Sequence, residues 1–397
     1  MLDRKQTSLG MMGYFCIGVT AVLIPSVMPS ITSEFFKTGI TLATIGLIFP
    51  AASVGSILGN LLVGIGSDVI GRRWLVGLAA FVLAIALVLA ASAQLWGLFV
   101  IGFVVVSTSQ GALATGINAM IADANPTSRA RALNALHGVY GLGATLSPLV
   151  IGLAIDRGVP WRWAMGGISL LWLVYSVLVR RSSQTVSLEK KAGPPLKLSL
   201  AMFRKGPFIA LFLVAFCYNG IAGSLLGWIA IFMRQSVGLS NLFSVYTISI
   251  FYVGLTTGRF ICAGIGERFS YARILQVLGL GIAVTYPLVV LGNYPVVVVA
   301  GVLLIGLSLS GLYPTALAFG SRLYPEQTGK LSGTLSIALT LGSMLPPLWT
   351  SAIAQHSSFQ VALSVNYLMA ALLIALTVYL GRIERPAAVA QPQATLS

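Results

Sequence analysis

The sequence GIGSDVIGRR occupies residues 64–73 and closes the apolar stretch 41–66. Its glycines permit a tight turn and close approach of neighbouring helices, because glycine carries no side chain. Asp68 can accept charge-assisted hydrogen bonds, and Arg72 and Arg73 can pair with it or with lipid phosphates. A polar turn of this kind between apolar stretches indicates a short loop that latches two membrane helices together.

Apolar residues dominate the chain around this loop. Of the 397 residues, 57% are hydrophobic and 8% are charged, whereas soluble domains carry about a quarter charged residues. A membrane helix needs about 20 apolar residues. Twelve stretches satisfy this: 9–31, 41–66, 74–92, 95–121, 132–155, 161–180, 206–233, 241–266, 272–291, 295–320, 331–353 and 359–381. We expect an all-α membrane protein whose helices satisfy their own backbone polar groups in the bilayer.

The distribution of lysine and arginine predicts the orientation of these spans. With the N-terminus inside, 20 of the 24 basic residues fall on the inner side, if Arg259 is counted with the inner loop that follows its span. The four outer ones are Lys37, Arg157, Arg162 and Arg234. This is the positive-inside pattern, and we expect a multi-pass protein of a bacterial inner membrane with both termini cytoplasmic. The net charge of +15 does not indicate a nucleic-acid partner, because the basic residues are scattered among short loops.

The two halves of the chain repeat at an offset of about 200 residues. Matching pairs are Gly64/Gly264, Arg73/Arg273, Pro126/Pro325, Gly143/Gly342 and Pro148/Pro347. Parallel repeats of six helices place a central site between two halves that rock against each other. We expect an N-terminal six-helix bundle at 1–180, a cytoplasmic linker at 181–205, a C-terminal six-helix bundle at 206–385 and a disordered tail at 386–397, with the bundles related by a pseudo-two-fold axis.

The loop at 64–73 resembles the loop signature of the major facilitator superfamily, Gly-x-x-x-Asp-x-x-Gly-Arg-Arg/Lys. A looser copy, GIGERFSYAR, stands at 264–273, and the segment DANPTSRAR at 123–131 is similar to the inner loops of that family. The resemblance implies the fold of the superfamily and a conformational role for these loops, which hold the outward-open state. The implied gating residues are Gly64, Asp68, Gly71, Arg72, Arg73, Arg129, Glu267 and Arg268.

The same resemblance implies a secondary active or facilitative transporter that moves a small organic solute by alternating access. The segment YNGIAGSLLGW at 218–228 resembles the fucose-permease-like branch, although Ala222 stands where that branch often carries an acidic residue. Aromatic rings beside amides favour a neutral, sugar-like solute. The geometry of the family and the helical spacing of polar residues indicate candidate substrate-binding residues. They are Gln110, Asn118, His137, Tyr140, Tyr218, Asn219, Trp228, Tyr252, Arg259 and Tyr313.

Other functions stay open. Arg259 stands well inside a span, where a cation is costly unless it is paired or faces water, so a carboxylate substrate is one alternative. The run GVYGLGATLSPLVIG at 138–152 partly matches a glycine–proline pattern associated with exporters, so efflux of drugs or metabolites by antiport is another. A non-transporting membrane sensor is the alternative of a different class.

The predicted spans contain few residue types that could carry protons, bind a metal or catalyse a reaction. The nine acidic residues all fall in termini, loops or helix ends. Since proton relays usually use intramembrane carboxylates or histidines, His137 is the best remaining titratable group, and protons stay one candidate coupling ion. The three cysteines lie singly in spans, and there is no ATP-binding loop or convergent catalytic set. We expect a monomer without metal or cofactor, and not an enzyme.

Overall fold

The computed structural model of the chain describes residues 4–125, 128–182, 200–265, 268–292 and 294–389. Over these residues the structure is helical, with no strand. Twelve helical segments among them are long and apolar enough to cross a membrane, which confirms the predicted spans. They are Lys5–Phe36, Leu42–Val63, Arg72–Ser92, Trp96–Ala124, Arg131–Asp156, Trp161–Arg181, Gly206–Gln235, Asn241–Ile265, Tyr271–Val290, Pro295–Leu323, Pro325–His356 and Phe359–Glu384.

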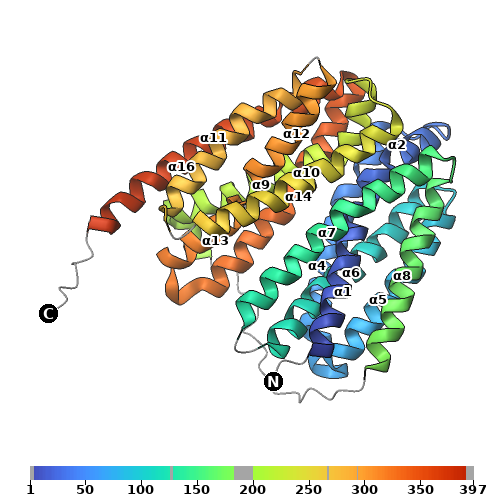
Figure 1. Ribbon diagram of the computed structural model, residues 1–397, viewed down its shortest axis with the longest axis horizontal. Helices are drawn as coiled ribbons and strands as arrows, with labels where there is room; N and C mark the ends of the chain where they lie inside the picture. The colour runs from blue at the N-terminus through green and yellow to red at the C-terminus, as the bar shows by residue number, and fades with distance from the viewer. Residues whose placement is uncertain (1–3, 126–127, 183–199, 266–267, 293, 390–397) are drawn as a thin grey trace. The chain divides into compact units, whose positions relative to one another are not determined.

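The first six spans contain eight helices (Figure 1). These are α1 Arg4–Ala21, α2 Leu23–Phe36, α3 Leu42–Gly46, α4 Ile48–Ile70, α5 Arg72–Ser92, α6 Trp96–Ala124, α7 Arg129–Asp156 and α8 Trp161–Arg181. The second six spans contain α9 Gly206–Gln235, α10 Asn241–Ile265, α11 Tyr271–Val290, α12 Pro295–Leu309, α13 Leu312–Leu323, α14 Thr328–His356, α15 Phe359–Ser364 and α16 Asn366–Val389. Two short 3-10 helices, η1 Leu200–Arg204 and η2 Pro325–Gln327, precede α9 and α14.

Proline explains three of the four places where a span is divided into two helices. Each of Pro25, Pro50 and Pro314 follows such a break. A proline has no backbone N–H and therefore leaves the carbonyl four residues earlier without its helical donor. The carbonyls concerned belong to Ala21, Gly46 and Ser310. The break between α15 and α16 has no such proline, and nothing in the structure explains it.

The structure describes only the ends of the predicted linker and the start of the predicted tail, so both segments stay predictions. Of the linker expected at 181–205, Arg181 still belongs to α8 and 200–204 form η1. Residues 183–199 lie outside the described residues. Of the disordered tail expected at 386–397, residues 386–389 fall within the bounds of α16, which ends at Val389. Residues 390–397 are outside the described part of the chain.

The chain forms two compact units, which do not coincide with two contiguous halves. Unit 1 comprises Met1–Gly193 and Leu226–Tyr252, and unit 2 comprises Pro194–Leu225 and Val253–Ser397. The end of α9 and the first half of α10 therefore group with the N-terminal helices. Within unit 1, the Ser249 hydroxyl donates to the carbonyl oxygen of Thr145 at 2.7 Å, which joins α10 to α7. The boundaries expected at 180 and 206 stay a prediction.

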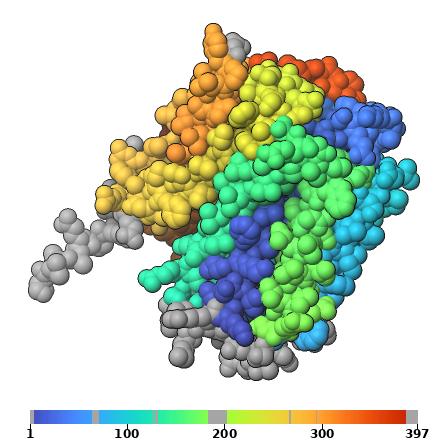
Figure 2. All heavy atoms as spheres, turned by 45° about the vertical axis from the view of Figure 1, so that its right-hand side comes forward, coloured from blue at the N-terminus to red at the C-terminus, as the bar shows by residue number. Residues whose placement is uncertain are grey.

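Small residues set the packing inside unit 1. Glycines on α4 and α6 interlock, because a β-carbon on Gly59 would overlap the carbonyl oxygen of Thr108, and one on Gly111 would lie 2.5 Å from that of Ser56. The two backbones approach each other closely as a result. Helices α5 and α6 and helices α5 and α8 also pack side by side (Figure 1). Helix α1 lies between α7 and α8 on the face shown in Figure 2.

Unit 2 contains a buried polar network near the break before α16. The Asn366 amide nitrogen donates to the Ser224 hydroxyl at 3.0 Å and to the Tyr286 hydroxyl at 2.7 Å. Ser224 and Thr350 lie 2.6 Å apart, and Thr350 donates to the carbonyl oxygen of Pro346. The Thr350 hydrogen is thus engaged, so Ser224 is the donor to Thr350. These bonds connect α9, α11, α14 and α16, and the Asn366 amide oxygen is buried with no hydrogen-bond partner among the residues that the structure describes.

Candidate functional site

Tyr14, Asn118 and His137 form a polar group in unit 1. Tyr14 on α1 donates its hydroxyl to the carbonyl oxygen of Ala114 at 3.3 Å, and the Asn118 amide on α6 donates to the same hydroxyl. The His137 ring on α7 meets the Tyr14 ring edge-on, with centroids 5.4 Å apart. Tyr14 is buried, Asn118 is half-buried and His137 is exposed. Three helices thus present one phenol, one amide and one imidazole together.

The sequence predicted two members of this group and missed Tyr14. A tyrosine hydroxyl within an otherwise apolar span was the available signal, but it did not show which helix the ring faces. Gln110, also on α6, points its amide toward α1 as well, where it donates to the carbonyl oxygen of Ile17 at 3.4 Å. Gln110 and Asn118, the two predicted residues of α6, therefore both contact α1.

A second set of predicted residues in unit 1 makes packing contacts. The Tyr140 ring on α7 lies 6.4 Å from the Tyr252 ring on α10, and the Trp228 ring on α9 lies 5.4 Å from the Phe49 ring on α4. Trp228 has no exposed surface, so a solute cannot contact it in this conformation. Tyr140 is half-buried and is the more accessible of the two predicted tyrosines.

Two of the predicted residues of unit 2 form a stacked tyrosine pair. Tyr218 on α9 and Tyr313 on α13 stack with centroids 6.3 Å apart and an interplanar angle of 16°. Both are half-buried. Next to Tyr218, the Asn219 amide donates to the carbonyl oxygen of Leu339 on α14 at 2.6 Å. The arrangement offers two nearly parallel aromatic rings that carry hydroxyl groups, while the Asn219 amide is engaged by the backbone of α14.

Arg259 is the cation that the sequence places inside a span. It lies on the part of α10 that belongs to unit 2 and is half-buried. Its side chain makes no hydrogen bond or ion pair with any other residue that the structure describes. The guanidinium therefore has donors available for an acceptor from outside the described chain.

The loop that begins α5 fastens three helices of unit 1. Arg72 forms an ion pair with Asp123 at the end of α6. Arg73 donates from Nε to the carbonyl oxygen of Val179 at 2.8 Å and from Nη2 to that of Arg180 at 2.5 Å, in the last turn of α8. A cation is favourable there because the carbonyl end of a helix is negative. The sequence did not indicate these partners.

The rest of the expected gating set is only partly described. Gly71 joins α4 to α5 with φ +81°, a conformation that requires glycine. Arg268 is exposed, and its backbone N–H donates to the carbonyl oxygen of Ile265. Glu267 lies outside the described residues, and the structure does not describe the burial of Gly64 or the side chains of Asp68 and Arg129. The gating role of the set stays a prediction.

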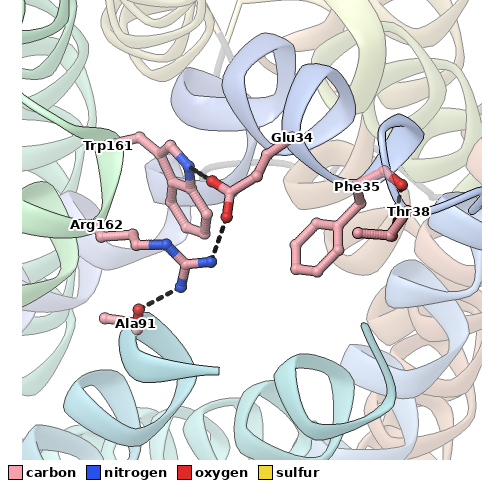
Figure 3. A network of polar contacts seen from close by, with 6 residues as sticks. All are labelled: Glu34, Phe35, Thr38, Ala91, Trp161 and Arg162. Carbon is pink, nitrogen blue, oxygen red and sulfur yellow. Dashed lines mark hydrogen bonds and ion pairs between the residues drawn. The ribbon is translucent and has the colours of Figure 1, made fainter. Parts of the chain in front are cut away.

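At the opposite end of unit 1, Glu34 on α2 gathers two residues of α8 (Figure 3). The Trp161 indole donates to Oε2 of Glu34 at 2.7 Å, and Arg162 Nη2 lies 2.5 Å from Oε1. Arg162 also donates to the carbonyl oxygen of Ala91 at the end of α5. Together these contacts join the ends of α2, α5 and α8.

In unit 2, Glu384 joins α16 to α11, the helices that correspond to α8 and α5 of unit 1. Its two carboxylate oxygens accept the backbone N–H groups of Tyr271 at 3.3 Å and Ala272 at 2.8 Å, in the first turn of α11. Arg322 lies 3.8 Å away. A carboxylate is stabilised at the positive N-terminal end of a helix. Among the described residues, no three His, Cys, Asp or Glu side chains gather as they would around a metal ion.

Comparisons with known proteins agree on one family. The family model of the Major Facilitator Superfamily matches residues 10–291 and 246–396. The uncharacterized MFS-type transporter YfkL of Bacillus subtilis (strain 168) is 23% identical over 88% of this chain and 89% of its own length. The glucose/mannose transporter GlcP of the same organism is 21% identical over 93% of both chains.

Solved structures show the same fold. The crystal structure of a D-xylose-proton symporter superposes with a TM-score of 0.76, at 13% sequence identity, over 96% of this chain and 97% of the other. At this identity the likeness concerns the arrangement of the helices.

Proposed function

Because this chain belongs to the Major Facilitator Superfamily, it is a membrane transporter, and we propose that its substrate is a neutral, sugar-like solute moved by alternating access. The observation that carries this proposal is the stacked pair of Tyr218 and Tyr313. Half-buried tyrosine rings offer apolar faces for the C–H surface of a sugar and hydroxyl groups for its edges.

The positions of the described carboxylates disfavour a cationic solute. The acidic side chains that the structure describes are Glu34, Asp123, Asp156, Glu326 and Glu384, and all of them lie near helix ends. The polar group of Tyr14, Asn118 and His137 likewise contains no carboxylate. The glucose/mannose transporter and the D-xylose symporter, whose names state sugars, are compatible with a neutral, sugar-like solute.

Uptake into proteoliposomes tests the proposal. Purified protein is reconstituted and offered radiolabelled D-glucose, D-glucuronate or a cationic drug, with and without a pH gradient. We expect D-glucose uptake, and a loss of about tenfold or more in Tyr218→Ala and Tyr313→Ala because each substitution removes one aromatic face. Tyr294→Ala is the matched control, because that ring is 73% exposed at the start of α12. Uptake limited to the drug, or equal uptake by all variants, would contradict the proposal.

Arg259 favours an organic anion as a second candidate substrate. A half-buried guanidinium with no partner among the described residues is a suitable receptor for a carboxylate. If this is correct, D-glucuronate is taken up in preference to D-glucose, and Arg259→Gln abolishes the preference. Full D-glucuronate uptake by Arg259→Gln removes this candidate.

We also propose the topology that the basic residues indicate: an inner-membrane protein with both termini cytoplasmic. On this basis, the ends of α5 and α8 that meet at Arg73 are cytoplasmic, and the Glu34–Arg162 pair is external. Single cysteines at Lys37 and Lys330 label from opposite sides of intact spheroplasts and inverted vesicles if the proposal is right. Labelling of both from one side would contradict it.

A further inference from the structure

The side chain of Arg180, in the last turn of α8, lies across the surface of α5. Its guanidinium carbon is 5.4 Å from the ring centre of Phe81 and 5.7 Å from that of Trp74. A β-carbon on Gly77 would lie 3.2 Å from Arg180 Cγ and 3.7 Å from Nε, so the stem of the side chain rests on that glycine. Trp74, Gly77 and Phe81 share one face of α5 at helical spacing, and Arg180 fills the notch between the rings.

The backbone of Arg180 is also held in place. Its carbonyl oxygen accepts a hydrogen bond from Arg73 Nη2 at 2.5 Å. The guanidinium itself donates no hydrogen bond and forms no ion pair with any residue in the described part of the chain. The protein therefore fixes the position of a planar fork of N–H donors and leaves the donors unused.

The surroundings of this fork are apolar and exposed. Trp74 is 64% exposed, and Leu78 and Ile85 continue an exposed apolar column along α5. Val177 and Leu178 do the same along α8. In a membrane protein such a column faces the lipid chains, and tryptophan with arginine at its end marks the level of the headgroups.

The charge at this corner is not neutralised by the described side chains. The nearby carboxylate of Asp123 is engaged by Arg72, and the exposed Arg181 adds a further positive charge. Arg162 resembles Arg180 in that its guanidinium also lies over a tryptophan, 4.7 Å from the centre of the Trp161 ring. Glu34 pairs with Arg162, whereas no described carboxylate pairs with Arg180.

We propose that Arg180, Trp74 and Phe81 form a binding site for the headgroup of an anionic phospholipid. The phosphate oxygens accept the free N–H groups of Arg180, in the two-point geometry that guanidinium and phosphate share. The acyl chains lie along the apolar column of α5 and α8. A lipid is the fitting source of the phosphate because the donors stand at the end of a lipid-facing surface, and anionic lipids attract basic residues at the inner leaflet.

Native mass spectrometry of the full-length protein in detergent tests this site by titration with phosphatidylglycerol. Removing one basic residue near a membrane costs about 1 kcal/mol, so Arg180→Gln is expected to weaken the first phosphatidylglycerol site about fivefold. Trp74→Leu keeps the charge and loses one ring contact, and it should weaken the site about two- to fivefold. Arg382→Gln, which removes an exposed charge at the end of α16, should leave this affinity unchanged.

Several results would overturn the proposal. They are an unchanged affinity in Arg180→Gln, an equal loss in Arg382→Gln, or phosphatidylcholine binding as tightly as phosphatidylglycerol. Complete displacement of the lipid by millimolar inorganic phosphate would identify a site for free anions instead. If Arg180→Gln does not fold, Trp74→Leu and the salt dependence of the natural protein decide. If the affinity for phosphatidylglycerol does not decrease when the salt concentration is raised, a charge-based headgroup site is excluded.

Discussion

The Nη2 atom of Arg162 lies 2.5 Å from the Oε1 atom of Glu34, and this ion pair ties the start of α8 to the last turn of α2 (Figure 3). The partial exposure of the two side chains, 20% and 38%, limits the energy of the pair, because water and salt screen it. The indole of Trp161 adds a second bond to the same carboxylate. The end of unit 1 is therefore held by charge as well as by packing.

A double-mutant cycle measures this pair. Glu34→Gln and Arg162→Gln each remove the ion pair, and we expect a coupling energy of about 0.5 to 1 kcal/mol in the free energy of unfolding in SDS. Lys37→Gln is the control for removing one exposed charge near Glu34, and it should change the free energy by less than about 0.5 kcal/mol. Strictly additive losses in the double variant would show that the pair does not stabilise unit 1.

The contact between α4 and α6 predicts opposite effects for two glycines. Gly59→Ala places a β-carbon against the carbonyl oxygen of Thr108, so the backbones must separate, at a cost of about 1 to 3 kcal/mol. Gly97→Ala is the matched control because its β-carbon meets open space and alanine has the higher helix propensity. Thermal unfolding in detergent should show a lower Tm for the first variant only. Equal Tm values would mean that α4 and α6 are not in close contact.

Arg73 is expected to matter more for stability than its neighbour Arg72. Arg73→Gln loses two charge-assisted hydrogen bonds to the end of α8, and we expect about 1 to 3 kcal/mol of destabilisation. Arg72→Gln breaks an exposed ion pair and should cost at most about 1 kcal/mol. Arg73→Lys should recover only part of the loss, since an ammonium lacks the planar fork that reaches both carbonyls. The SDS unfolding midpoint ranks the three variants, and a larger loss in Arg72→Gln would reverse the assignment.

The Asn366 network predicts a sensitive position in unit 2. Asn366→Leu removes the amide that donates to Ser224 and Tyr286, and we expect a loss of about 1 to 3 kcal/mol. Asn366→Asp should cost more, because a buried carboxylate lacks both donors and is poorly solvated. Asn241→Leu, at the exposed start of α10, is the control. A Tm for Asn366→Leu equal to that of the control would show that the network contributes no stability.

The sequence predicted the helical framework well for a physical reason. A membrane span averages hydropathy over about 20 residues, so single exceptions do not obscure it. The same averaging hides the breaks within spans, although the prolines at positions 25, 50 and 314 do mark three of them. The α15–α16 break has no comparable mark in the sequence.

The candidate site was less accessible to prediction because its contacts join residues far apart in the chain. Asn118 and His137 were predicted, whereas their partner Tyr14 was not, since periodicity shows which residues share a helix face but not what that face contacts. Arg73 is similar, because its acceptors are backbone carbonyls, which no residue type identifies. Burial also separates Trp228 from the half-buried tyrosines, a distinction that composition cannot make. The substrate-binding roles stay predictions.

The contacts that join the third span to the sixth span differ between the two halves of the chain. In the first half an arginine from α5 grips the end of α8, and in the second half a glutamate from α16 grips the start of α11. Arg273, the counterpart of Arg73 in the repeat, lies instead 5.8 Å from the Phe269 ring centre. A twelve-span chimera built from two copies of one half would therefore contain the same contact twice: two arginine–carbonyl contacts from the first half, or two glutamate–amide contacts from the second. The two halves share the outline of the repeat, but the third and sixth spans are joined by a side-chain donor in the first half and by a side-chain acceptor in the second.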